Sequence, residues 1–129
     1  MFSSNTSAVT DVQLQMLGID QMHADGFEGA GIVIAVFDSG FPGVNLVPAF
    51  QSIFAGSQIK MTMDFITNSG NVYQFYDHGT IVFSTIAAQQ TDFKGGATKG
   101  RLSSFCYRRC LLGIQSGRVQ LAFCRRESR

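Results

Sequence analysis

The chain has 129 residues, 45% apolar and 15% charged, a composition typical of one globular domain with a modest core rather than of a disordered chain. Its formal net charge of +1 gives no sign of a polyanionic partner, so we expect no nucleic-acid binding. No stretch approaches the roughly 18 consecutive apolar residues of a membrane span, and no signal peptide is visible, so we expect no membrane partner and predict no compartment from the chain itself.

The charge is unevenly distributed along the chain. Residues 1–100 contain three lysines and eight acidic residues, a net charge of −5. Residues 101–129 contain all seven arginines, all three cysteines and a single acidic residue, Glu127, a net charge of +6. We therefore expect two pieces of different kind, divided at Gly100. An odd number of cysteines, all in the second piece, indicates no disulfide framework.

The first predicted element is a helix over residues 11–23, where apolar residues approximate helical spacing and Thr10 or Asp11 can cap the start. Glycines at positions 26, 29 and 31 then predict a turn.

The most informative stretch is the unbroken apolar run of residues 32–37, which is rich in β-branched side chains and bounded by glycines. Such a run predicts a strand buried on both faces, as in a parallel sheet under helices. The run ends in a carboxylate, Asp38. Sites in open α/β sheets collect beyond the carboxyl ends of the strands. A carboxylate placed there is costly to desolvate without a partner, so we expect one.

Further along, residues 60–66 alternate well enough to predict a second strand, and residues 68–71 predict a turn. Residues 77–88 contain five β-branched side chains, which favours a strand. Small residues among apolar ones over about three turns equally suit a buried helix. Periodicity leaves both alternatives open. Glycines at 95, 96 and 100 then predict a loop.

Two motifs carry a resemblance to a known family. Val36-Phe37-Asp38-Ser39-Gly40 and His78-Gly79-Thr80-Ile81-Val82 resemble the aspartate and histidine motifs of the subtilisin-like serine proteases (subtilases), in that family's chain order. Residues 21–31 resemble the lead-in to the family's first core strand, and residues 95–98 resemble the turn before its next strand. The resemblance covers about residues 12–100.

The resemblance implies an α/β fold with a parallel sheet between helices, truncated after the helix that begins at the histidine. Residues 1–100 would be the N-terminal portion of a peptidase domain, and residues 78–88 a buried helix. Asp38 and His78 would be catalytic residues acting on a peptide or protein substrate. In this mechanism Asp38 accepts a hydrogen bond from His78 Nδ1–H while Nε2 takes the proton of a serine hydroxyl. An extracellular location is expected by family alone.

The chain also departs from the family's pattern. The nucleophile's Gly-Thr-Ser-x-Ala/Ser-x-Pro element is absent, as is the segment that supplies an asparagine to the oxyanion hole; Ser103, Ser104 and Ser116 match neither. We therefore expect no peptidase activity from this polypeptide alone. Asp77 stands where many members have glycine and is expected to face solvent, and Ser39 is at most a support residue. We expect no cofactor; calcium is common in the family, but no acidic cluster marks a site.

Three interpretations of residues 101–129 differ in chemistry. A metal site would use Cys106, Cys110 and Cys124, but a convincing fourth ligand is missing. A basic patch for nucleic acid or membrane would need a helical face, which arginine mixed with leucine and cysteine does not form. Out-of-frame translation just beyond Gly100 fits the abrupt change of composition best.

Two other functions compete with the protease interpretation. A nucleotide-binding domain needs its glycines after the first strand, whereas here they precede it. A non-catalytic pseudoprotease or peptide-binding module on the same scaffold would also lack the serine, but it should keep the rest of the core. Since the catalytic pair remains while much of the sheet is missing, a fragment is favoured. Its exposed strand edge predicts marginal stability or self-association.

Overall fold

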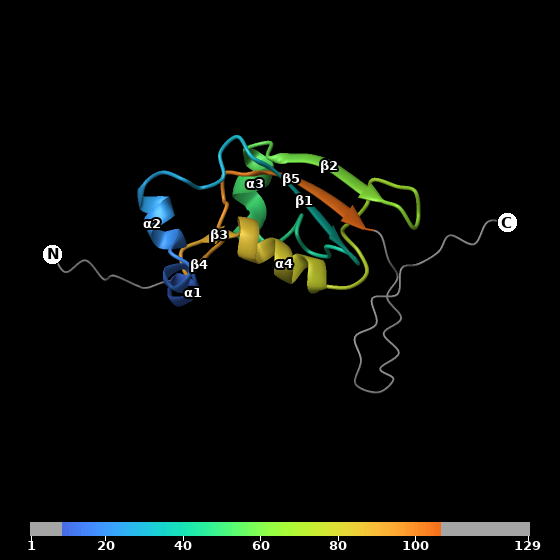
Figure 1. Cartoon of the computed structure of the whole chain (residues 1–129). Coiled ribbons are helices and arrows are strands. Elements are labelled where there is room, and N and C mark those ends of the chain that lie inside the picture. Colours follow the sequence, from blue (N-terminus) through green and yellow to red (C-terminus); the bar gives the residue numbers. More distant parts are fainter. Residues whose placement is uncertain (1–8, 107–129) are drawn as a thin grey trace, which may run out of the picture.

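The computed structural model describes residues 9–106, which form a small α/β unit (Figure 1). Its elements, in chain order, are α1 (Asp11–Met16), α2 (Ile19–Ala24), β1 (Val33–Asp38), the 3₁₀ turn η1 (Pro48–Phe50), α3 (Gln51–Ala55), β2 (Ile59–Asp64), α4 (His78–Ala87), β3 (Gln89–Gln90), β4 (Phe93–Lys94) and β5 (Arg101–Cys106).

Three strands form one parallel sheet in the order β1-β5-β2 (Figure 1). The last strand of the described chain therefore lies in the middle, between the two earlier ones. The short strands β3 and β4 form a separate antiparallel pair. The parallel α/β class expected from the sequence is confirmed in this form.

The pairing register brings two carboxylates to the same edge of the sheet. Asp38, the last residue of β1, pairs with Cys106 of β5, and Asp64, the last residue of β2, pairs with the same cysteine. Because the strands are parallel, all three ends lie at the carboxyl edge, where α/β proteins place their sites.

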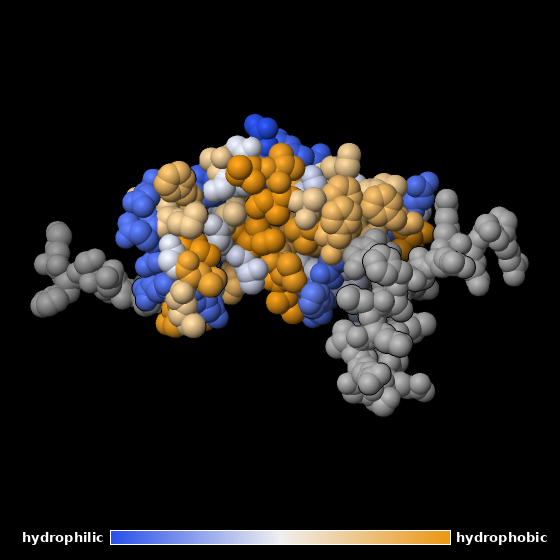
Figure 2. Space-filling model, viewed as in Figure 1, coloured by the Kyte–Doolittle hydropathy of each residue, from blue (hydrophilic) through white to orange (hydrophobic). Residues whose placement is uncertain are grey.

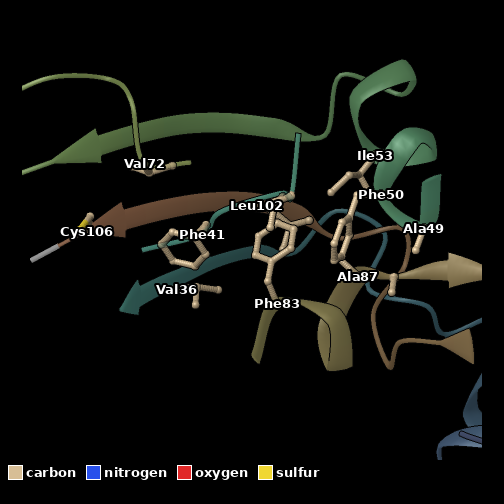
Figure 3. Packing of buried hydrophobic residues seen from close by; sticks show 12 residues of the cluster. Val36, Phe41, Ala49, Phe50, Ile53, Val72, Phe83, Ala87, Leu102 and Cys106 are labelled. Carbon is tan, nitrogen blue, oxygen red and sulfur yellow. The ribbon is translucent and has the colours of Figure 1, made fainter. Parts of the chain in front are cut away.

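One face of the sheet carries the hydrophobic core (Figure 3). Phe83 of α4 is fully buried, and its ring makes edge contacts with Phe50 of η1 at 5.6 Å and with Phe41 at 6.0 Å between ring centroids. Leu102 of β5 and Ile53 of α3 are also fully buried beside them. These elements pack together because each presents an apolar side to the same space.

The opposite face of the sheet is open within residues 9–106, which corrects the expectation of a strand buried on both faces and of a sheet between helices. Val33 and Phe37 of β1 are 60% and 56% exposed, and Met61 of β2 is 57% exposed. The rings of Phe37 and Phe65 stack on either side of Phe105. Apolar atoms gather over the middle of the molecule and toward the strand ends in Figure 2. A parallel strand is buried on both sides only where helices cover both faces of its sheet. In residues 9–106 the helices cover one face.

The helix predicted over residues 11–23 is divided into α1 and α2. Gly18 separates them with a φ of +68°, a left-handed conformation in which glycine meets no steric cost. The apolar periodicity continues across this break, so periodicity alone did not reveal it. The second strand spans residues 59–64, slightly earlier than the predicted 60–66.

The ambiguous segment after residue 77 is a helix. α4 begins at His78, and its buried residues are Gly79, Phe83 and Ala87, one face at helical spacing. The expected helix that starts at the histidine is confirmed for residues 78–87, but it is buried along one face only, and Ile81 on the other side is 58% exposed.

The expected division at Gly100 does not coincide with the end of the sheet. Residues 101–106 form the central strand, in which Leu102, Ser104 and Cys106 are buried. The arginine and cysteine of these residues had suggested that the chain changes in kind at Gly100. A strand, however, requires only that its alternate side chains suit the two faces of the sheet. The rest of the tail, residues 107–129, lies outside the described residues, as do Cys110, Cys124 and Ser116.

Candidate catalytic site

Asp38 is held at the carboxyl end of β1 by hydrogen bonds to both carboxylate oxygens. The backbone N–H of Ser39 donates to Oδ1 at 2.7 Å, and the Ser39 hydroxyl donates to the same oxygen at 3.0 Å. Oδ2 faces His78 Nδ1 at 2.8 Å. The Asp38 side chain is only 11% exposed. These contacts restrict the carboxylate to one orientation and give Ser39 the supporting role expected for it.

His78 is the first residue of α4, so the helix start fixes its position relative to the sheet. An ionised carboxylate only accepts hydrogen bonds, so the proton in the bond to Asp38 belongs to His78 Nδ1. In the neutral ring this leaves Nε2 as the acceptor. The His78 side chain is 72% exposed, and among residues 9–106 none hydrogen bonds to Nε2. In the neutral ring Nε2 is therefore an open acceptor that points away from the Asp38 carboxylate.

Forty residues of chain separate Asp38 from His78, and the structure brings both predicted site residues together. An aspartate that fixes the tautomer of a histidine, whose other nitrogen is open, is an arrangement suited to general acid–base catalysis. It supplies no nucleophile. Ser103 and Ser104 are buried within β5, and neither hydrogen bonds to His78. Asp77 is exposed, as expected.

Asp64 is a second carboxylate at the same edge, to which the sequence had given no role. It is fully buried and accepts hydrogen bonds from Ile66 N, Thr67 N, Thr67 Oγ1 and Gln74 Nε2. Burial by itself raises the pKa of Asp64, but the hydrogen bonds from Thr67, Ile66 and Gln74 outweigh it and hold the pKa below its usual range. With its oxygens occupied, Asp64 fixes the turn after β2 and is not a free base.

The threonine three residues after Asp64 was a usable signal for that turn, because aspartate followed at short range by a hydroxyl residue commonly closes on its own backbone. An aspartate whose side chain closes such a turn has a structural role rather than a catalytic one.

The residues on which the nucleotide-binding and metal-site alternatives depend have structural roles in the fold. Gly29, in the cluster before β1, has a φ of +84°, and a Cβ there would lie 3.0 Å from Ala97 Cβ, so its space is taken by the loop before β5. Cys106 is buried in the core. Across residues 9–106 no three His, Cys, Asp or Glu side chains are grouped as metal ligands would be.

Comparison with known proteins found no protein-family model that matches the chain and no match among curated proteins. Of the helices within residues 9–106, none has the length and apolar character needed to cross a bilayer.

Proposed function

We propose that this chain is the N-terminal part of a subtilisin-like serine endopeptidase domain, in which Asp38 and His78 are two members of an Asp/His/Ser triad. The observation that carries the proposal is the 2.8 Å contact between Asp38 Oδ2 and His78 Nδ1, made at the carboxyl edge of a parallel sheet by the first residue of a helix that packs one face against the core. The two sequence motifs and their chain order support it. The substrate would be a peptide or protein, and an extracellular location follows from the family only.

In this proposal each residue has a defined task. Asp38 holds His78 in the tautomer with Nδ1 protonated and stabilises the imidazolium that forms during the reaction. His78 Nε2 removes the proton of a serine hydroxyl as that oxygen attacks the peptide carbonyl, and then returns it to the leaving amine. The serine and the oxyanion donors are not found in this sequence.

The polypeptide by itself is therefore expected to be inactive. In subtilisin itself, loss of the serine alone lowers turnover by a factor on the order of 10⁶. The residual rate in that enzyme depends on an oxyanion hole and on substrate binding, much of which this chain also lacks.

The coding DNA offers the first test. The out-of-frame interpretation predicts that another reading frame, entered close to codon 100, continues without early stops into a Gly-Thr-Ser-x-Ala/Ser-x-Pro element. Because residues 101–106 pair within the sheet, the alternative frames should be entered at each codon from 100 to 107. Early stops in both alternative frames would contradict this origin of the tail.

The second test uses a fluorophosphonate probe, which labels activated serines. The frame-restored chain is expected to label, its His78→Ala variant to lose labelling, and its Asp77→Asn variant to keep it. The present chain should not label. A frame-restored, folded protein that contains the serine but does not label would favour the alternative, a non-catalytic peptide-binding module on the same scaffold.

A further inference from the structure

The backbone of the loop that follows Asp38 lies directly against the first turn of α4. A Cβ atom on Gly79 would lie 2.2 Å from the carbonyl oxygen of Gly40 and 2.9 Å from Asp38 Cβ. Both values are below the 3.0 Å that real Cβ contacts respect. Gly79 is buried, so the space cannot be opened by turning a side chain into solvent. The helix start can approach the loop this closely only because residue 79 has no side chain.

The same loop is enclosed from its other side. A Cβ on Gly40 would lie 2.0 Å from the carbonyl oxygen of Gln74, and Gly40 has a φ of +148°. Phe41 N donates to Val72 O at 2.9 Å. The backbone after Asp38 is therefore held between residues 72–75 and the start of α4.

A hydrogen bond from a hydroxyl group also joins α4 to the loop that follows Asp38. Thr80 Oγ1 donates to the carbonyl oxygen of Pro42 at 2.8 Å and is partly buried. Elsewhere in α4, Thr85 uses its hydroxyl differently and donates to Val82 O of its own helix at 2.8 Å. Thr80 thus connects α4 to the loop that follows Asp38, whereas the Thr85 hydroxyl bonds only within its own helix.

The Asp38–His78 bond needs such support. The His78 side chain is 72% exposed, and a single bond between side chains with one exposed partner holds a geometry only weakly. Productive orientation of a general base requires placement within a fraction of an ångström. Because Asp38 lies two residues before Gly40 and His78 one residue before Gly79, the backbone contact sets the distance between them.

We propose that Gly79 and Thr80 are positioning residues for His78, which place its Nδ1 against Asp38 by fastening the start of α4 to loop 40–42. The catalytic meaning of this placement rests on the proposed function, whereas the placement itself does not. Relieving the 2.2 Å contact to an ordinary separation of about 3.4 Å displaces the helix start by roughly 1 Å, enough to lengthen a 2.8 Å hydrogen bond beyond its working range.

The test compares five variants of the full chain: Gly79→Ala, Thr80→Val, Thr80→Ser and the controls Gly96→Ala and Thr85→Val. Gly96 lies outside the left-handed region, and a Cβ there would meet its nearest neighbour at 3.6 Å, an ordinary contact. The readout is the Nδ1 proton resonance of His78 in nitrogen-15 histidine spectra. The chain has two histidines, and a His23→Gln background leaves only His78. Circular dichroism establishes that each variant is folded.

The Nδ1 proton resonance is expected to disappear in Gly79→Ala and Thr80→Val, and to return in Thr80→Ser, which restores the hydroxyl. Both controls should keep it. The proposal is overturned if folded Thr80→Val retains the resonance, or if Thr85→Val loses it equally. Should Gly79→Ala fail to fold, the Thr80→Val and Thr80→Ser pair decides the outcome. No serine is needed for this readout, so its result stands apart from the probe labelling that tests the protease proposal.

Discussion

Asp38 uses its two carboxylate oxygens for different partners, and this division has a measurable consequence. Ser39 donates two hydrogen bonds to Oδ1, which leaves Oδ2 for His78 Nδ1. In Asp38→Asn the two donors of Ser39 would keep the amide oxygen in the Oδ1 place and turn the amide nitrogen toward the ring. Since that nitrogen is a donor, His78 Nδ1 must then accept, and the ring proton moves to Nε2.

We expect nitrogen-15 histidine spectra of Asp38→Asn to report the Nε2-protonated tautomer at His78, whereas the wild type reports Nδ1 protonation. Asp77→Asn removes the same charge from the residue adjacent to His78, but Asp77 is exposed, and the carboxylate bonded to the ring is that of Asp38. It should keep the wild-type tautomer. An unchanged tautomer in Asp38→Asn would show that this carboxylate does not orient the ring.

At the scale of elements, an ion-pair cluster joins the turn before β1 to β4 and to the loop before β5. Glu28 contacts Lys94 at 2.9 Å and also contacts Lys99, while its own side chain is 13% exposed. The hydrogen bonds from Lys99 and Lys94 lower the pKa of Glu28 from 4.5 to about 2, more than burial raises it. The cluster fastens two segments that flank neighbouring parallel strands.

A lowered carboxylate pKa contributes stability above the unfolded value and loses it as the pH falls through the folded value. The free energy of unfolding should therefore drop between about pH 4.5 and pH 2 by roughly 1–2 kcal/mol on account of Glu28, with solvent around the lysines screening the pairs. Urea unfolding at several pH values measures this. Glu28→Gln should flatten the dependence in this window, and Asp92→Asn, at an exposed position, should not. Equal slopes in wild type and Glu28→Gln would refute the assignment.

Local sequence decided some elements and not others. The run before Asp38 is apolar, rich in β-branched side chains and flanked by glycines, and these local features predicted β1 correctly. Residues 78–87 are rich in β-branched side chains, which favours a strand. Tertiary packing selects the helix instead, because the helix places Phe83 against the rings of Phe41 and Phe50. The break at Gly18 depended on a backbone conformation that hydrophobic periodicity does not encode.

At the scale of the whole molecule, we expect the open face of the sheet to be a contact surface between copies of the chain. Val33, Phe37, Met61 and Phe65, each more than half exposed, present on the order of 400 Å² of adjoining apolar surface. Soluble monomers that expose such an area commonly use it for contacts. The self-association expected from the sequence on account of a strand edge is thus given a second physical cause, the uncovered face.

We expect sedimentation velocity to show an average mass that rises with concentration. Phe37→Lys, which places a charge on the open face beside Phe105, should weaken association at least about tenfold, equivalent to about 1.4 kcal/mol. Leu46→Lys is the matched control, because Leu46 is 75% exposed but lies in the loop between β1 and η1, away from the sheet. If both variants associate as the wild type does, the open face is not the contact surface.

The sequence by itself predicted the parallel α/β class and the strand that ends in Asp38, because apolar runs and turn glycines are local properties. The pairing of Asp38 with His78 was expected only from the resemblance of their two motifs to those of the subtilases, and the structure shows the contact. Only the tertiary structure decided that one sheet face is uncovered, that residues 101–106 occupy the centre of the sheet, and that Asp64 is buried and fully bonded. Each of these depends on which distant segments come to lie beside a residue, and neither composition nor spacing carries that information.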